Sequence, residues 1–368
     1  MDFLSDFTAL FLGKLQSPTL GFLIGGMVVA SVNSRLQIPD AVYKFIVFML
    51  LIKVGLSGGI AIRNANLTEM LLPAAFAVIT GIIIVFVGRY TLGLLPKVKT
   101  VDAIATAGLF GAVSGSTLAA ALTLMESEGL QYEPWAAALY PFMDIPALVT
   151  AIVLASVYVT KQREAAEARL SEGLNKEEYL SKQEYLSNGE PHEQQPNPIS
   201  KRVKIWPIVQ ESLQGSALSA LLLGLALGIL TRPESVYDNF FNPAFRGLLS
   251  ILMLVMGMEA AARISELRKV GQWYALYAFF APLLHGFIAF GLGMIAHAVT
   301  GFSYGGVVIL AVIAASSSDI SGPPTLRAGI PKANPSAYIG SSTAVGTPVA
   351  LALGIPLYIG LAQALMGS

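Results

Sequence analysis

Ten apolar stretches, each long enough to cross a lipid bilayer as a helix, limit what this chain can fold into more than any other feature. The hydrocarbon core of a bilayer is about 30 Å thick, and a helix of about 20 apolar residues spans it. A composition of 54% hydrophobic and 12% charged residues agrees with a membrane protein. The sequence therefore predicts an all-α integral membrane protein with ten transmembrane helices. They are expected near residues 18–34, 41–62, 70–94, 101–126, 134–160, 215–231, 244–264, 271–298, 304–327 and 336–366.

A charged segment, residues 161–204, separates the first five stretches from the last five and holds eight Lys or Arg and eight Glu. We expect a water-exposed linker that is helical at its Ala- and Glu-rich start. In the short loops, nine basic residues lie on the side of the linker and four on the other side. Because basic loops stay inside the cell, the linker is predicted to be cytoplasmic and both termini to lie outside. Residues 1–16, which carry acids before their apolar residues, predict an amphipathic helix on the membrane surface rather than a cleaved signal peptide.

The two halves of the chain align with each other at a constant offset of 202 residues. The densest match places AASSSDISGPPTL (314–326) over AVSGSTLAAALTL (112–124). Because each half holds an odd number of spans, a repeat between them must have inverted topology. We predict two inverted five-helix repeats, residues 1–160 and 205–368, joined by the linker. Further matched pairs are Gly26 and Gly228, Leu50 and Leu252, Gly55 and Gly257, and Pro146 and Pro348.

The two best-matched segments interrupt spans four and nine with Ser, Gly and Pro. Transporters built from inverted repeats form a midplane site from broken helices, whose N-terminal ends face an anion while freed carbonyls and hydroxyls hold a cation. Gly322 breaks the second helix, and Pro323 suits the first turn of a new one. The alternative interpretation is that small residues let membrane helices pack closely. Two breaks at corresponding depth favour the site, because irregular backbone at membrane depth requires surrounding protein or a cavity.

Charged residues within the predicted spans also indicate function. Asp319 lies in the second break and Asp144 between two prolines of span five. An intramembrane carboxylate costs at least ~2.5 kcal/mol to insert, so both are candidate cation ligands. For Asp144 a hydrogen bond to backbone freed by proline is the alternative. Lys53 and Glu259 lie on unbroken spans, where packing, subunit contact, gating and substrate contact all remain open. Candidates to complete an oxygen cage are Ser341, Ser342, Thr343 and Thr347.

Composition and energetics narrow the function classes. A net charge of zero gives no sign of a nucleic-acid partner, the absence of cysteine excludes thiolate chemistry, and the three histidines are too far apart for a local transition-metal cluster. Moving one anion into a negative-inside cell costs about 2.3 kcal/mol per 100 mV, which one accompanying Na⁺ cancels. The alternatives are a sodium-coupled carrier of another anion, a cation/proton exchanger, an intramembrane aspartyl hydrolase using Asp144 and Asp319, and a membrane scaffold or sensor. A larger organic anion would need a fixed Arg or Lys, which neither break contains.

Four motifs, FGAVSGSTLAAAL, YPFMDIP, GMEAA and AASSSDISGPPTLRAGIP, set in five plus five spans, closely resemble the cyanobacterial high-affinity sodium-dependent bicarbonate transporter family. The resemblance implies sodium/bicarbonate symport across the inner (plasma) membrane as part of a carbon-concentrating mechanism, with no enzymatic activity. It implies a homotrimer in which an elevator-like core domain moves against a gate domain. It also implies a cytoplasmic trimeric PII-like regulator that senses adenine nucleotides.

Carried onto this chain, the resemblance implies a core domain of about residues 70–160 and 271–368 and a gate domain of about 18–62 and 215–264. Na⁺ would be the coupling ion, with no other cofactor. Whether Asp319 or Asp144 is its principal ligand stays open. Bicarbonate is expected at Phe110, Gly111, Ala112, Ser114, Ser116, Ser316, Ser317 and Ser318, and Na⁺ at Asp144, Asp319, Thr117 and Ser318.

Overall fold

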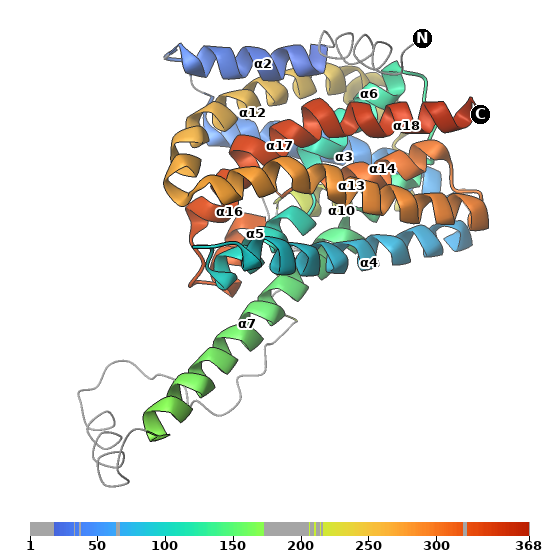
Figure 1. Cartoon of the computed structure of the whole chain (residues 1–368). Coiled ribbons are helices and arrows are strands. Elements are labelled where there is room, and N and C mark those ends of the chain that lie inside the picture. The colour runs from blue at the N-terminus through green and yellow to red at the C-terminus, as the bar shows by residue number, and fades with distance from the viewer. Residues whose placement is uncertain are drawn as a thin grey trace, which may run out of the picture.

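The computed structural model describes residues 18–32, 34–36, 38–63, 67–172, 206, 210, 214, 216–318 and 322–367. The predicted surface helix at residues 1–16, the linker beyond residue 172 and the candidate ligand Asp319 lie outside the described residues. The described chain is a helical bundle in which helices are joined by short turns (Figure 1).

The helices of the first half begin and end close to the predicted limits, except that α7 continues past residue 160 to Glu172. They are α2 (Pro18–Ser31), α3 (Asp40–Ile62), α4 (Leu67–Thr91), η1 (Leu92–Leu94), α5 (Thr100–Gly111), α6 (Gly115–Ser127), η2 (Pro134–Leu139) and α7 (Tyr140–Glu172). Span four is thus divided into α5 and α6. Span five begins as the 3₁₀ helix η2 and continues as α7.

The second half follows the same order. Its helices are α10 (Ser216–Leu230), α11 (Glu234–Val236), η3 (Tyr237–Phe241), α12 (Asn242–Val270), α13 (Gln272–Thr300), α14 (Tyr304–Ala315), α15 (Gly322–Gly329), α16 (Pro335–Ser341), η4 (Ser342–Gly346), α17 (Thr347–Val349), η5 (Ala350–Gly354) and α18 (Ile355–Met366). Two of the short segments, η4 and η5, are π-helical turns within span ten.

Seven helical segments of the described chain are long enough and apolar enough to cross a membrane. The other three predicted stretches hold shorter apolar helices at Gly21–Ser31, Ser219–Leu230 and Tyr304–Ala315. The last is short because its helix ends at Ala315, where the polar break begins. The prediction of an all-helical chain with several membrane-spanning segments is confirmed for the described residues.

Glycines bring helices from opposite halves of the chain into backbone contact. A Cβ atom on Gly26 of α2 would collide with the carbonyl of Leu254 in α12, and one on Gly257 would collide with the carbonyl of Leu23. In the same way, a Cβ atom on Gly55 of α3 would collide with a carbonyl of α10. Small residues at membrane-helix interfaces allow this close approach. The pairs α2 with α12 and α3 with α10 therefore pack backbone to backbone.

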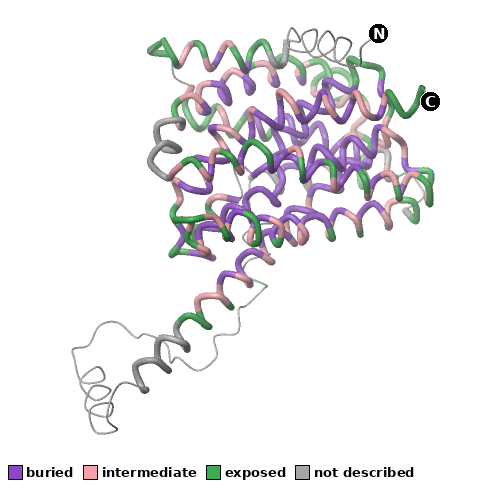
Figure 2. The backbone as a smooth tube through the Cα atoms, in the orientation of Figure 1, coloured by how far each residue is buried: buried purple, intermediate pink, exposed green. Residues whose placement is uncertain are grey.

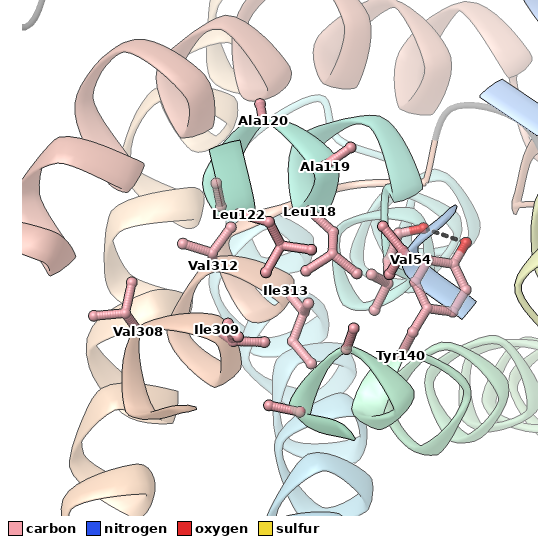
Figure 3. Packing of buried hydrophobic residues seen from close by; sticks show 14 of the residues in the cluster. Val54, Leu118, Ala119, Ala120, Leu122, Tyr140, Val308, Ile309, Val312 and Ile313 are labelled. Atoms are coloured by element: carbon pink, nitrogen blue, oxygen red, sulfur yellow. Dashed lines mark hydrogen bonds between the residues drawn. The ribbon is translucent and has the colours of Figure 1, made fainter. Parts of the chain in front are cut away.

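The centre of the bundle is formed by the broken helices. Asp102–Gly111 of α5 and Gly305–Ala315 of α14 are buried throughout, whereas exposed residues lie on the outer helices and at helix ends (Figure 2). In Figure 3, Leu118 and Leu122 of α6 belong to one buried cluster with Val312 and Ile313 of α14. The packing therefore encloses both breaks in protein.

Helix α7 reaches well beyond the bundle. Its 33 residues give a length of about 50 Å at 1.5 Å per residue, against a bilayer core of about 30 Å. Its C-terminal half projects from one end of the bundle, and α18 ends at the opposite end (Figure 1). The predicted helical start of the linker is confirmed as far as Glu172.

Candidate substrate and cation site

Both predicted breaks occur where the sequence places them. Helix α5 ends at Gly111, Ala112 is extended (φ −81°, ψ 148°), and α6 begins at Gly115. Helix α14 ends at Ala315, and Ser316 is likewise extended (φ −78°, ψ 171°). Residues 316–318 are not helical, and α15 begins at Gly322 with Pro323 in its first turn, as predicted.

The two breaks contact each other directly. The backbone N–H of Ser114 donates to Ser316 Oγ at 3.0 Å, and the N–H of Ser318 donates to the carbonyl of Leu109 at 3.1 Å. Ser316 Oγ in turn donates to the carbonyl of Ile313 at 2.7 Å. Buried backbone groups that leave a helix need such partners. The non-helical segments of spans four and nine therefore satisfy each other where they cross.

The start of α6 is capped by its own hydroxyls. Ser114 Oγ accepts from the N–H of Thr117 at 3.2 Å and lies 2.8 Å from Ser116 Oγ. A capped helix N-terminus carries partial positive charge and backbone donors, and both features suit an anion. The first turn of α6 is therefore the anion-attracting end of this break.

Asp144 of α7 reaches into the first break. Its side chain is fully buried, and its Oδ1 accepts from the N–H of Val113 at 2.9 Å. Among the described residues no hydrogen-bond partner exists for its Oδ2, nor for Thr117 Oγ1, which is also fully buried. The backbone partner of Asp144 is thus the N–H of Val113, in the first break, rather than the backbone freed by proline that was the alternative from sequence. Asp144, held against Val113, and Thr117 of α6 thus each carry a buried oxygen with no hydrogen-bond partner among the described residues, and oxygens of this kind suit a hard cation.

A comparison with known families gives the class of protein to which this chain belongs. The chain matches the family described as the Na⁺-dependent bicarbonate transporter superfamily over residues 18–363, a range that contains both breaks. The chain belongs to this superfamily. A comparison with curated proteins gives no match. Membership in a transporter superfamily, together with the apolar helices, makes this a multi-pass membrane protein.

In this superfamily member, span ten adds hydroxyl groups to the second break. Ser317 Oγ lies 2.6 Å from Ser342 Oγ and 3.4 Å from Thr347 Oγ1. Ser342 begins the π-helical turn η4, and such turns are frequent at functional sites. Of the other candidates for an oxygen cage, Ser341 donates to the carbonyl of Tyr338 in its own helix. Ser342 and Thr347 are therefore the two cage candidates whose hydroxyls lie next to the second break.

Three of the predicted bicarbonate-binding residues lie at the end of α5. The ring of Phe110 packs edge-on against Tyr277 of α13, with centroids 5.3 Å apart. Gly111 is the last residue of α5, and the N–H of Ala112 donates to the carbonyl of Gly108 at 3.0 Å. The C-terminal end of a helix presents carbonyl oxygens. Around these three residues the backbone therefore offers more acceptors than donors, in contrast to the start of α6.

Of the remaining predicted site residues, Ser318 is described by the structure and Asp319 is not. Ser318 is buried, and its Oγ accepts from the N–H of Gly322 at 2.8 Å, which links the break to α15. Asp319 lies outside the described residues. The sequence reasoning missed Tyr140, whose hydroxyl donates to the carbonyl of Val113 at 3.0 Å. Its position four residues before Asp144, on the same face of α7, was the available signal.

Proposed function

We propose that this protein is a sodium-dependent bicarbonate symporter that imports HCO₃⁻ with the Na⁺ gradient. The observation that carries the proposal is the crossing of the two breaks, bordered by a helix N-terminus and by a fully buried carboxylate with one unpartnered oxygen. Co-transport of one Na⁺ cancels the electrical cost of one HCO₃⁻, and the Na⁺ gradient supplies about 1.4 kcal/mol per tenfold concentration difference.

The two ions are assigned to neighbouring positions at the crossing, both beside the first turn of α6. The anion lies at the first turn of α6, where donors gather. The cation lies at Asp144 Oδ2 and Thr117 Oγ1, with Asp319 and Ser318 as further ligands from span nine. Bicarbonate contacts are assigned to Ser114, Ser116 and the segment Ser316–Ser318. The acceptor-rich segment Phe110–Ala112 is assigned to the O–H of bicarbonate, the one group of this anion that donates a hydrogen bond.

The same proposal includes ten spans arranged as two inverted repeats. It is supported by the hydrogen bond between Ser114 and Ser316, which occupy matching positions 202 residues apart. A second support is the helix pairing. Helix α2 of the first repeat packs on α12 of the second. The helices 202 residues away from these two, α10 and α3, pack on each other in the same way.

The domains follow from this arrangement. The gate domain contains α2, α3, α10 and α12, and the core domain contains the two broken helices with α4, α7, α13 and span ten. We propose that the core domain carries the ions by an elevator motion against the gate domain. The packing of α2 with α12 and of α3 with α10 supports a gate domain that stays together as the core moves.

The cellular setting rests on the family resemblance. We place the protein in the inner membrane of a cyanobacterial cell, in a carbon-concentrating mechanism, as a homotrimer inhibited by a PII-like protein that binds adenine nucleotides. The linker is assigned to the cytoplasm and both termini to the outside. The opposite positions of the projecting part of α7 and the end of α18 support placing the linker and the C-terminus on different sides of the membrane (Figure 1).

Uptake of labelled bicarbonate into proteoliposomes, with an inward Na⁺ gradient and with K⁺ in its place, tests the symport. Uptake that requires Na⁺ supports the proposal, and uptake indifferent to Na⁺ overturns it. A ΔpH-driven flux without bicarbonate would identify a cation/proton exchanger instead. Uptake of labelled organic anions into the same proteoliposomes tests the alternative of a sodium-coupled carrier for another anion. Family membership favours transport over the intramembrane hydrolase considered from sequence.

A further inference from the structure

An ion pair that the proposed ion sites do not use lies between α3 and α6. Lys53 Nζ is 3.4 Å from Glu126 Oε1, and the lysine side chain is only 4% exposed. Glu126, in the last turn of α6, is 31% exposed and also accepts from the hydroxyl of Tyr132 at 3.2 Å. This pair answers a question that the sequence left open, the role of a lysine inside a membrane-spanning helix.

The partners belong to different proposed domains. Lys53 Nζ lies over the ring of Phe245 at 4.2 Å and near that of Tyr237 at 5.9 Å, and both rings are part of the gate domain. Glu126 and Tyr132 are part of the core domain. The lysine is therefore anchored in the gate by its aromatic contacts, while its counter-charge is attached to the core.

Apolar contacts also join α3 to the core domain. Leu51 of α3 packs against Gly115, and Val54 shares a buried cluster with Leu118 and Tyr140 (Figure 3). Apolar surfaces slide past one another while remaining buried, but a buried ammonium that loses its carboxylate loses its compensation. The ion pair is therefore a position-specific contact, unlike these apolar contacts between α3 and the core domain.

We propose that Lys53 and Glu126 form a latch between the gate and core domains, closed in this conformation and opened when the core moves. The inference rests on the proposed two-domain transport cycle. In this proposal the ion pair controls how much of the protein occupies this end state and how fast the core domain leaves it. Neither residue contacts the described part of the ion site.

A cysteine pair tests the latch directly, because the chain contains no cysteine of its own. The Lys53→Cys/Glu126→Cys variant is treated with a short bifunctional methanethiosulfonate, since the two native side chains together reach further than a disulfide. We expect cross-linking to abolish Na⁺-dependent bicarbonate uptake and a reductant to restore it. Each single variant, treated in the same way, controls for modification of one cysteine.

The matched control is a second ion pair, Arg63 with Glu234, which joins the end of α3 to α11 on the gate side. Cross-linking the Arg63→Cys/Glu234→Cys variant should leave uptake unchanged, because both positions move together. Failure of positions 53 and 126 to cross-link overturns the latch, as does unaltered uptake by their cross-linked form. Absence of uptake by the wild type overturns the symport proposal itself, and the latch with it, so the two failures are distinguishable.

Charge reversal supplies an independent readout. Lys53→Glu and Glu126→Lys each place like charges together, and each should slow uptake at least about tenfold. Combining both reversals should recover part of the lost uptake, because the attraction returns with opposite polarity while the contacts of Lys53 with the rings of Phe245 and Tyr237 are lost. Equal losses in the single and double variants, with unchanged thermal stability in detergent, would contradict the latch.

Discussion

The backbone N–H of Ser114 donates to the hydroxyl of Ser316, which lies 202 positions further along the chain. Each residue borders the break in its own helix, so the bond joins the two interruptions to each other. A hydroxyl at this point satisfies a buried amide that the helix has released. The two helix breaks thus satisfy each other's buried polar groups where they meet.

Asp144→Asn should remove the dependence of uptake on Na⁺. The amide oxygen still accepts from the N–H of Val113, so the break keeps its geometry, but the negative charge is lost. Uptake measured against Na⁺ concentration checks this. Asp102→Asn is the matched control, because Asp102 is also buried but accepts from the N–H of Asn334 outside the breaks. Normal Na⁺ dependence in Asp144→Asn would move the cation site elsewhere.

Thr117→Val should weaken Na⁺ binding and at the same time stabilise the Na⁺-free protein. The buried Oγ1 of Thr117 has no hydrogen-bond partner among the described residues, and such a group costs about 1–3 kcal/mol. Thermal unfolding in detergent with and without Na⁺ measures both effects. Thr123→Val on the same helix removes a hydroxyl bonded to the carbonyl of Ala119 and should leave the Na⁺ response intact. Identical behaviour of the two variants would argue against a cation at Thr117.

Ser316→Ala should reduce bicarbonate uptake at least about tenfold, because the amide of Ser114 loses its acceptor at the crossing. Initial rates over a range of bicarbonate concentrations check the effect. Ser250→Ala is the control, since that hydroxyl donates only along α12, to the carbonyl of Arg246. Wild-type rates in Ser316→Ala would show that the contact between the breaks is dispensable.

Gly26→Ala should destabilise the protein by about 1–3 kcal/mol through overpacking. The added methyl group meets the carbonyl of Leu254, so α2 must move away from α12. Gly21→Ala lies on the same helix with open space around it and should leave stability unchanged. Thermal unfolding of the two purified variants separates these expectations. Equal stability would contradict the direct backbone contact of α2 with α12.

Much of the local structure could be predicted from sequence. The apolar stretches and the interruptions at residues 112–114 and 316–318 depend on local composition, and most helices end within a few residues of the predicted limits, whereas α7 continues to Glu172. The serines at the crossing and the choice of Asp144 as a candidate were also accessible, because a charge within a membrane span is unfavourable without a purpose.

Other features of the site required knowledge of the packing. The π-helical turns of span ten, which bring Ser342 to Ser317, have no recognisable signal in the sequence. Asp144 accepts from the N–H of Val113 and Tyr140 donates to its carbonyl, and both bonds depend on where α7 lies relative to the end of α5. Sequence spacing within α7 placed those side chains on one face but did not supply the partner.

The sequence by itself determined that this chain forms apolar helices, that two of them are interrupted by small polar residues, and that carboxylates lie within the spans. Only the tertiary structure decided that Ser114 meets Ser316 and that Lys53 faces Glu126. Helix formation and its interruption depend on neighbours within a few residues, because backbone hydrogen bonds are local. The choice of partner depends on how helices distant in the chain pack, and close approach at glycines such as Gly26 and Gly257 fixes that packing.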